Sequence, residues 1–322
     1  MIRILNAESL DYSPIALEIL ERFAVIEAAD LPRSELFSRL RDVDILIVRL
    51  RSQIDREIID SAPRLKAIVT ATTGLDHIDM AYAAEHGIAV LSLKGETDFL
   101  RSIPATAEHT WGLLLALVRN LPWAYQSVLQ GEWNRDRFRG RDLAGRRLGI
   151  IGLGRIGEKV ARYGQVFGMQ VSAYDPYQMY RLPEVERQPT LEALCRASDI
   201  VSLHVPLNEE TRGLFGSQEL GWLPPGALLV NTARGAVLDE TALFKALESG
   251  RLGGAALDVL SDETSSTRPL TARLVEYARS HSNLLLTPHI GGATLDSMHS
   301  TEIFMAHKLE RFIKGNFPRL IP

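Results

Sequence analysis

The sequence is poor in cysteine, with Cys195 as its one example among 322 residues. A single thiol excludes an internal disulfide and a metal site built from several cysteines. Because disulfides are rare in the cytosol, a chain that has none is expected there by default. We therefore predict a cytoplasmic protein without a metal site.

Long apolar runs and a strong charge imbalance are also missing. No stretch reaches the roughly 18 consecutive apolar residues of a membrane helix, and residues 1–6 lack the basic start, apolar core and cleavage site of a signal peptide. The 36 Lys and Arg residues nearly balance the 40 Asp and Glu residues, which leaves a net charge of −4. We expect neither a membrane nor a nucleic acid as a partner.

The chain does contain short apolar strands that alternate with amphipathic helices, a pattern typical of parallel α/β domains. Its 322 residues exceed what one compact core usually holds. Strands are predicted at 3–5, 45–48, 67–71, 89–91, 148–151, 171–174, 200–204, 228–231, 255–258 and 284–287, and helices at 13–22, 79–86, 104–120 and 301–314. These two α/β series predict two doubly wound parallel-sheet domains with a ligand-binding cleft between them.

The most informative motif is a glycine-rich segment after the strand at 148–151. It reads Gly-Leu-Gly-Arg-Ile-Gly from Gly152 to Gly157, and a helical pattern and a strand ending at Asp175 follow it. A strand, a G-x-G-x-x-G turn, a helix and an acidic residue about 20 positions on form the dinucleotide-binding fingerprint. The alternative is a plain glycine-rich turn with Asp175 facing solvent.

Each part of this motif has a physical reason. Gly152 permits a tight turn, Gly154 lets the backbone approach a pyrophosphate, and Gly157 lets the helix pack closely on its strand. The helix N-terminus offers unpaired N–H groups and a partial positive charge to the phosphates. Asp175 would accept hydrogen bonds from the adenosine ribose and repel a 2′-phosphate. The motif therefore predicts NAD rather than NADP as the cofactor.

Four later segments carry a resemblance to a known family. They are His-Val-Pro-Leu from His204, Asn-Thr-Ala-Arg-Gly from Asn231, residues 256–263, and Thr-Pro-His-Ile-Gly-Gly-Ala-Thr from Thr287. In this order and spacing, together with the glycine motif, they resemble the D-isomer-specific 2-hydroxyacid dehydrogenases from about residue 48 to 314. The likeness is greatest to the D-3-phosphoglycerate dehydrogenase-like members without an appended regulatory domain.

The resemblance implies a Rossmann-type dinucleotide-binding domain at 101–289 and a flavodoxin-like substrate domain formed by 1–100 and 290–322. Asp258 resembles the family residue that holds the nicotinamide carboxamide. The other residues that the resemblance places at the cofactor are Arg155, Ile156, His204, Pro206, Ala233 and Gly291.

In the family, the region around the predicted helix at 104–120 embraces a partner subunit, so the resemblance implies a homodimer. Trp111, Trp123 and Trp133 lie on or after this helix. We expect them to be core or dimer-contact residues.

Three residues at the family's motif positions would reduce a 2-oxo acid. His289 would be the general acid and base, because histidine titrates near neutrality. Glu263 would pair with His289 and keep it protonated in the reductive direction, since a nearby negative charge favours the charged imidazole. Arg234 would bind the substrate carboxylate and polarise the carbonyl with its two-pronged guanidinium.

Beside Glu263, a neighbouring acidic residue, Asp262, is the alternative partner for His289. The family has Pro directly after this glutamate, whereas this chain has Thr264, and Asp262 precedes it. The spacing from Asp258 favours Glu263 as the partner of His289. The insertion at 265–282 is longer than the family's and is expected to alter access to the site.

The loop after the strand at 67–71 resembles the family loop whose backbone N–H groups receive the substrate carboxylate. Gly74 and Leu75 would donate these groups, and the alternative is a plain tight turn. His77 is expected to be a surface or helix-capping residue.

Positive side chains near this loop indicate whether the substrate carries a second anionic group. Arg49 matches an arginine that meets a distal anion in the phosphoglycerate-type enzymes, and the alternative is a solvated surface arginine. Arg51 follows it. Lys94 stands where many members of the family have Asn-x-Pro-Gly, a departure that leaves the exact substrate open, and Arg101 would add further positive charge.

The sequence thus predicts an NAD-dependent oxidoreductase for a small D-2-hydroxy acid and its 2-oxo acid, with a dianionic substrate such as 3-phosphoglycerate favoured. The alternative within the family is a hydroxypyruvate or glyoxylate reductase or a D-lactate-type enzyme. From another class, an NAD-sensing corepressor-like interaction protein is opposed by the intact Arg234, Glu263 and His289. A metal hydrolase is opposed because the histidines lack a metal-binding spacing.

Overall fold

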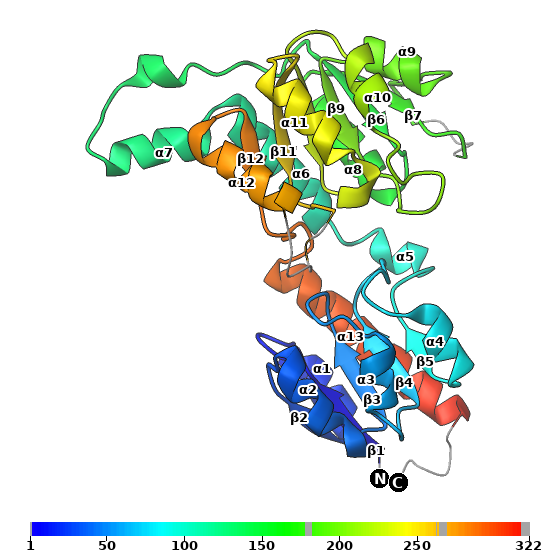
Figure 1. Cartoon of the computed structure of the whole chain (residues 1–322). Coiled ribbons are helices and arrows are strands. Elements are labelled where there is room, and N and C mark those ends of the chain that lie inside the picture. Colours follow the sequence, from blue (N-terminus) through cyan, green and yellow to red (C-terminus); the bar gives the residue numbers. More distant parts are fainter. Residues whose placement is uncertain (1, 178–181, 262, 264–268, 317–322) are drawn as a thin grey trace. The chain divides into compact units, whose positions relative to one another are not determined.

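The computed structural model in Figure 1 describes residues 2–177, 182–261, 263 and 269–316. The chain divides into two compact units, the first made of Met1–Ile103 with Thr294–Pro322 and the second of Pro104–Ala293. That these units are a substrate domain and a dinucleotide-binding domain remains a prediction. Within the described ranges, every helix falls short of the length and apolar content needed to cross a membrane.

Unit 1 contains a five-stranded parallel sheet in the order β2-β1-β3-β4-β5, which is the flavodoxin-like order. The strands are β1 (Ile2–Asn6), β2 (Ala24–Ala28), β3 (Ile45–Val48), β4 (Ala67–Thr70) and β5 (Ala89–Leu91). Helices α1 (Pro14–Glu21) and α13 (Leu295–Asn316) cover one face, and α2 (Arg33–Arg39), α3 (Arg56–Asp60) and α4 (Met80–Glu85) cover the other. The short α5 (Thr97–Leu100) follows β5.

The central strands of unit 1 are apolar because both faces of the sheet are covered. Every residue of β3 and β4 is buried, as is usual for strands between two helical layers. The parallel register pairs Val48 with Thr70. The loops that follow β3 and β4 therefore leave the same edge of the sheet side by side.

Unit 2 contains a seven-stranded parallel sheet in the order β12-β11-β10-β9-β6-β7-β8, a Rossmann arrangement whose strand order reverses between β6 and β9. The strands are β6 (Arg147–Ile151), β7 (Gln170–Tyr174), β8 (Val185–Arg187), β9 (Ile200–Leu203), β10 (Ala227–Asn231), β11 (Leu252–Leu257) and β12 (Leu284–Leu286). Helices α6 (Ala105–Val118) and α8 (Arg155–Val166) cover one face, and α9 (Leu191–Arg196), α10 (Ser217–Trp222), α11 (Glu240–Glu248) and α12 (Pro269–Ser280) cover the other.

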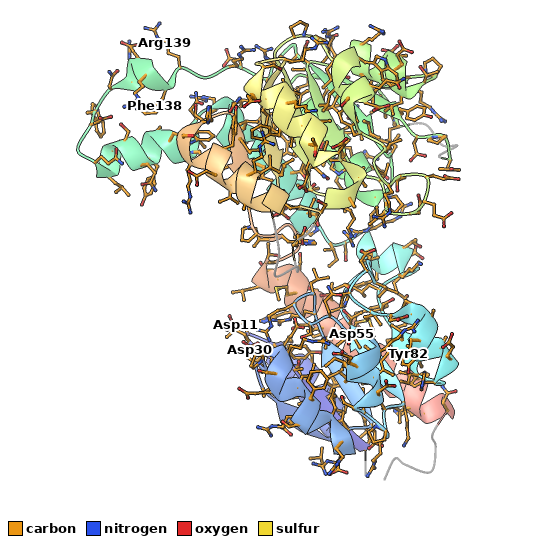
Figure 2. The ribbon with its side chains drawn as sticks, viewed as in Figure 1. Asp11, Asp30, Asp55, Tyr82, Phe138 and Arg139 are labelled. Atoms are coloured by element: carbon orange, nitrogen blue, oxygen red, sulfur yellow. The ribbon has the colours of Figure 1, made fainter. Side chains whose placement is uncertain are left out.

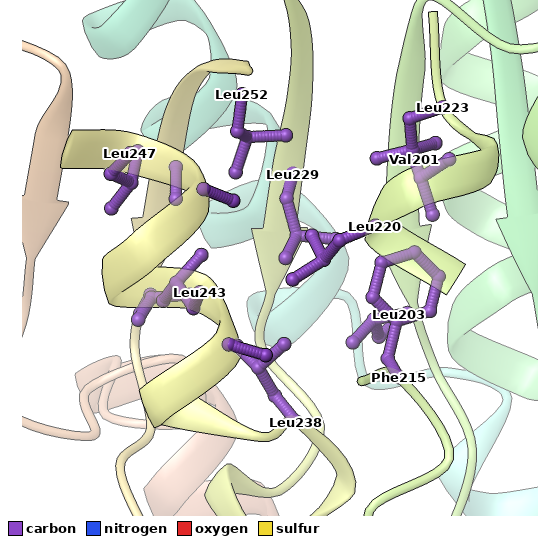
Figure 3. Packing of buried hydrophobic residues seen from close by; sticks show 14 of the residues in the cluster. Val201, Leu203, Phe215, Leu220, Leu223, Leu229, Leu238, Leu243, Leu247 and Leu252 are labelled. Carbon is purple, nitrogen blue, oxygen red and sulfur yellow. The ribbon is translucent and has the colours of Figure 1, made fainter. Parts of the chain in front are cut away.

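The core of unit 2 joins the sheet to its helices. Figure 3 shows Leu229 of β10 beside Leu220 of α10 and Leu243 of α11, and all three are buried. Burial of a leucine side chain contributes about 1.5–3 kcal/mol. On the opposite face, the buried Trp111 of α6 donates its indole N–H to the Val160 carbonyl at 3.2 Å. This packing holds the strand ends that carry the predicted site.

Several elements differ from the sequence-based prediction. The edge strands β2 and β8 were not predicted. Helix α13 begins at Leu295, before the predicted residue 301, because the Thr294 hydroxyl accepts the Ser297 N–H at 3.2 Å and caps it. The predicted helix at 104–120 ends as α6 at Val118, because Asn120 has a φ of 54° and turns the chain into α7 (Leu121–Leu129).

One side chain is not where the sequence placed it. His77 is buried, with 4% of its surface exposed, so the prediction of a surface residue was wrong; the residue that caps α4 is Asp79. Of the tryptophans predicted to be core or dimer-contact residues, Trp111 is buried in the core, whereas Trp133 is 89% exposed, so for Trp133 dimer contact stays a prediction.

Candidate active site

The three predicted catalytic residues follow three neighbouring strands of unit 2. Arg234 comes after β10, Glu263 after β11 and His289 after β12. These strands are adjacent and parallel, so their following loops leave one edge of the sheet. That edge is where α/β domains bind ligands.

His289 and Glu263 form a direct pair. The Nδ1 atom of His289 lies 2.6 Å from Oε2 of Glu263, and the other carboxylate oxygen accepts the Leu260 N–H at 2.9 Å. Both side chains are partly exposed, at 27% and 30%. With Nδ1 directed at the carboxylate, Nε2 is the ring nitrogen left to exchange a proton with a ligand. The competing Asp262 and Thr264 lie outside the described residues.

The backbone at His289 is unusual and is held by Asp258. His289 has a φ of 56°, a left-handed conformation that costs energy for a residue with a side chain. Its N–H donates to the Asp258 carbonyl at 2.8 Å, and the N–H groups of Ile290 and Gly291 donate to the Asp258 carboxylate at 2.9 and 2.7 Å. Asp258 therefore fixes the loop that presents the histidine.

Asp258 has two further partners that the sequence did not reveal. The Thr287 hydroxyl donates to its carboxylate at 2.6 Å, and Nε2 of His109 lies 3.1 Å from it. Asp258 is 2% exposed. Burial alone would raise its pKa, but the hydrogen bonds from His109, Thr287 and the backbone outweigh burial, so the pKa is lowered. The sequence carries no signal that singles out His109, which lies among Thr106, Glu108 and Thr110 in the polar first half of α6.

Gly235 lets the loop of Arg234 approach the loop of Glu263. A Cβ atom at Gly235 would lie 2.0 Å from the carbonyl carbon of Leu260, so only glycine allows this contact. The buried Asn231 side chain shapes the same loop, because it accepts the Ala233 N–H and donates to the Arg234 carbonyl, both at 3.0 Å. The Arg234 guanidinium itself donates to the Ala233 carbonyl at 2.7 Å.

The glycine motif has the geometry that its spacing predicts. Gly152 has a φ of 89°, and a Cβ there would lie 2.9 Å from the His204 backbone. A Cβ at Gly157 would lie 2.1 Å from the Gly152 carbonyl oxygen, whereas Gly154, at the N-terminus of α8, faces open space. The turn, the close packing and the open backbone are thus all present in the structure.

Arg155 and Asp175 fit a dinucleotide at this turn. Burial lowers the pKa of Arg155, and its side chain has no hydrogen-bond or ion-pair partner in the described part of the chain. A desolvated cation without a partner is costly, and a pyrophosphate would supply the missing anion. The Asp175 carboxylate is fixed at the end of β7 by the N–H groups of Leu153 and Tyr177 at 2.8 and 2.9 Å.

The remaining predicted cofactor residues surround the same sheet edge. His204 follows β9, its Nε2 lies 2.8 Å from the Ser202 hydroxyl, and burial lowers its pKa to about 3, so it is neutral at physiological pH. Ile156 packs against the core beneath α8 and Pro206 is exposed.

In unit 1, the predicted carboxylate-binding loop follows β4. The Thr72 hydroxyl donates to the Gly74 carbonyl at 2.8 Å, and the Thr72 carbonyl accepts the Leu93 N–H at 2.9 Å. No hydrogen bond within the described part of the chain occupies the N–H groups of Gly74 and Leu75. These two donors are therefore available to a ligand.

The two arginines beside this loop are paired within unit 1. Arg49 binds Glu302 at 2.6 Å, and Arg51 binds Asp30, labelled in Figure 2, at 2.9 Å. Arg49 is thus not the solvated surface residue of the alternative prediction. Lys94 and Arg101 are exposed, and their side chains have no hydrogen-bond or ion-pair partner among the residues described.

Residues 111–291 match the family model of the D-isomer specific 2-hydroxyacid dehydrogenase, NAD binding domain. Among curated proteins, D-3-phosphoglycerate dehydrogenase of Methanocaldococcus jannaschii is 36% identical over 98% of this chain, which spans 58% of that relative's length. Glyoxylate reductase of Thermococcus gammatolerans is 38% identical over 91% of this chain and 86% of its own.

A solved structure is similar over nearly the whole length. The crystal structure of D-lactate dehydrogenase from Aquifex aeolicus, complexed with NAD and lactic acid, has a TM-score of 0.82 and 29% identity, covering 98% of this chain and 97% of that one.

Among the described residues, no group of three or more His, Cys, Asp or Glu side chains is placed to hold a metal ion.

Proposed function

The chain belongs to the D-isomer-specific 2-hydroxyacid dehydrogenase family of NAD-dependent oxidoreductases, and on this premise we propose that Arg234, Glu263 and His289 are its catalytic residues. The observation that carries the assignment is the 2.6 Å pair of His289 and Glu263. A carboxylate beside an imidazole stabilises its charged, proton-donating form, and this pair lies at the strand ends of unit 2, the edge where α/β domains bind ligands.

NADH, when bound, supplies the hydride to the 2-carbon of the oxo acid. Nε2 of His289 gives its proton to the carbonyl oxygen, which becomes the hydroxyl, and Glu263 stabilises the imidazolium before the transfer. Arg234 binds the carboxylate and draws electron density towards the carbonyl oxygen. Within unit 1, the N–H groups of Gly74 and Leu75 are the proposed donors to a substrate carboxylate.

Contacts at the glycine turn support the proposed cofactor residues Gly152, Gly154, Gly157, Arg155 and Asp175. Arg155 would bind the pyrophosphate and Asp175 the adenosine ribose. Asp258, His204, Gly291 and their neighbours Ile156, Pro206 and Ala233 would line the remainder of the NAD site.

For the substrate we propose a monoanionic 2-oxo acid of the glyoxylate or hydroxypyruvate type. The carboxylate partners of Arg49 and Arg51 weigh against the dianionic substrate that the sequence favours. A dianionic acid such as 3-phosphoglycerate is the second candidate, because the exposed Lys94 has no partner among the described residues and D-3-phosphoglycerate dehydrogenases are among the relatives.

The test is NADH oxidation, followed by absorbance, with glyoxylate, hydroxypyruvate, pyruvate and 3-phosphohydroxypyruvate. Turnover of at least one acid by the wild type, and its loss in His289→Asn, is the expected result. NADH binding without turnover of any acid would contradict the proposal and favour the NAD-sensing interaction protein instead.

We also propose a homodimer formed through α7 and the segment after it. Helix α7 extends away from the sheet of unit 2 in Figure 1, and it exposes Tyr125 and Leu129, each at 63%; the exposed Trp133 follows four residues after Leu129 in the chain. Exposed apolar groups of this kind mark interaction surfaces. Light scattering should give a dimer mass for the wild type and a lower mass for Leu129→Glu; a monomeric wild type would contradict the proposal.

A further inference from the structure

The carboxyl edge of the unit 1 sheet holds a buried charge pair that joins residues 253 positions apart. Nη2 and Nε of Arg49, just after β3, donate to Oε1 of Glu302 on α13 at 2.6 and 3.1 Å. The Glu302 side chain is 1% exposed and that of Arg49 is 20% exposed. The pair is therefore largely shielded from solvent.

Further contacts hold both members of this pair. Nη1 of Arg49 donates to the Leu10 carbonyl at 2.7 Å, and its guanidinium lies 5.7 Å from the Tyr12 ring. The second oxygen of Glu302 accepts the Ser13 N–H at 2.8 Å. The arginine is thus held on several sides by the segment that precedes α1 and by α13.

The position of Arg49 makes this arrangement relevant to the substrate. Val48 pairs with Thr70, so Arg49 leaves the sheet beside the loop whose Gly74 and Leu75 N–H groups are available to a carboxylate. A cation next to that loop is well placed for a second anion on the same ligand. A phosphate would have to take Arg49 from Glu302, which would leave a buried carboxylate without its cation and close to another anion.

We propose that Glu302 is a specificity-determining residue that withholds Arg49 from the substrate and so disfavours acids with a second, distal anion. Glu302 is a positioning residue here, because it acts through Arg49 and not on the substrate. The inference rests on the proposed function, in which the loop at Gly74 receives the carboxylate. It predicts that removal of the Glu302 charge creates a binding site for a distal phosphate.

The test compares 3-phosphohydroxypyruvate with hydroxypyruvate, which differ only in the phosphoryl group. Glu302→Gln should raise the ratio of the two kcat/KM values at least about tenfold, as expected for one charged hydrogen bond, mainly by lowering KM for the phosphorylated acid. In the double variant Glu302→Gln, Arg49→Gln this gain should disappear. Glu310→Gln, on the same helix but paired with Lys314, is the matched control and should leave the ratio unchanged.

If neither Glu302→Gln nor Glu302→Ala folds, the single variant Arg49→Gln, in which Glu302 is kept, still tests the proposal. Arg49→Gln alone should not lower the ratio, since Glu302 already occupies the arginine. A selective loss of the phosphorylated substrate in that variant would overturn the proposal, as would a gain in Glu302→Gln that survives the loss of Arg49.

A binding measurement separates failure of this proposal from failure of the proposed function. Inorganic phosphate should raise the melting temperature of Glu302→Gln more than that of the wild type or of the double variant. If no 2-oxo acid were turned over, the proposed function would fall, yet this comparison would still test the Glu302 proposal. Equal phosphate effects in all three proteins would overturn it.

Discussion

Asp258 binds His289 through its main chain, with the carbonyl of the aspartate 2.8 Å from the N–H of the histidine. The carboxylate of the same aspartate holds the next two N–H groups. One buried residue thus stabilises the left-handed backbone at His289, and the ring can point at Glu263 without rearrangement. Preorganisation of this kind reduces the cost of orienting an acid for proton transfer.

The first prediction concerns the proton donor. His289→Asn should lower kcat by about 10²–10⁴, the usual effect of removing a positioned general acid, and should still bind NADH. Asparagine tolerates a positive φ better than alanine, so it removes the imidazole and keeps the loop. Steady-state kinetics and NADH fluorescence titration measure the two quantities. Turnover within a few-fold of the wild type would mean that another group is the acid.

The second prediction concerns the partner of His289. Glu263→Gln removes the negative charge beside Nδ1 of His289, so kcat/KM for oxo-acid reduction should fall about tenfold or more, as expected for one charged hydrogen bond, in steady-state kinetics. Asp262→Asn is the control and should leave kcat/KM unchanged. A fall with Asp262→Asn and none with Glu263→Gln would mean that the carboxylate partner has moved by one residue.

The third prediction concerns cofactor choice. The wild type should have a higher kcat/KM with NADH than with NADPH, because the fixed Asp175 carboxylate opposes a 2′-phosphate, and Asp175→Ala should narrow the difference. Asp175 also accepts the Leu153 and Tyr177 N–H groups, one on each carboxylate oxygen, so Asp175→Asn removes the charge but keeps one of these two acceptors, whereas Asp175→Ala removes both. A wild type that prefers NADPH would refute this role.

The fourth prediction concerns the contact between the loops of Arg234 and Glu263. Gly235→Ala would place a methyl group 2.0 Å from the Leu260 carbonyl carbon, and overpacking of this kind costs about 1–3 kcal/mol or more of stability. Urea unfolding should register the loss, and kcat/KM should fall because the loops are displaced.

Gly221→Ala in α10 is the matched control for this change. A Cβ at Gly221 meets no atom within 4 Å, and alanine is favoured over glycine within a helix by about 0.5–1 kcal/mol. The control should therefore be neutral or more stable. Equal stability of Gly235→Ala and the wild type would show that the loops move apart without cost.

The pattern of apolar residues in the sequence predicted the strands that lie buried between two layers of helices. A buried strand such as β3 is a continuous apolar run, so the sequence alone locates it. The edge strands β2 and β8 were missed, because their residues are largely half-buried or exposed and lack such a run. The glycine motif was readable because positive φ and close approach leave few alternatives to glycine.

Contacts between residues far apart in the chain could not be read from the sequence. The pairing of Arg49 with Glu302 spans 253 positions, and that of His109 with Asp258 spans 149. Glu302 and His109 lie outside the motifs, and both pairings depend on how helices pack against strand ends. The sequence could therefore nominate Arg49 as an anion ligand but could not reveal the carboxylate that already binds it.

The last prediction concerns stability against pH. Burial lowers the pKa of His204 to about 3, well below its ordinary value of about 6.5. Between these two pH values the unfolded chain binds a proton on His204 that the folded chain does not bind. The contribution of the neutral His204 to the free energy of unfolding is therefore complete above pH 6.5 and is lost as the pH falls towards 3. The loss for one proton is about 1.4 kcal/mol per pH unit.

His204→Gln cannot bind this proton, so the advantage of the wild type over the variant in unfolding free energy should shrink from pH 6 to pH 4, because other groups affect both proteins alike. Urea unfolding at a series of pH values measures it. Ser202→Ala removes the hydroxyl near Nε2 but keeps the imidazole, so it should retain the pH dependence of the wild type. A difference between wild type and His204→Gln that stays constant over this range would show that the imidazole is protonated in the folded protein as easily as in the unfolded chain.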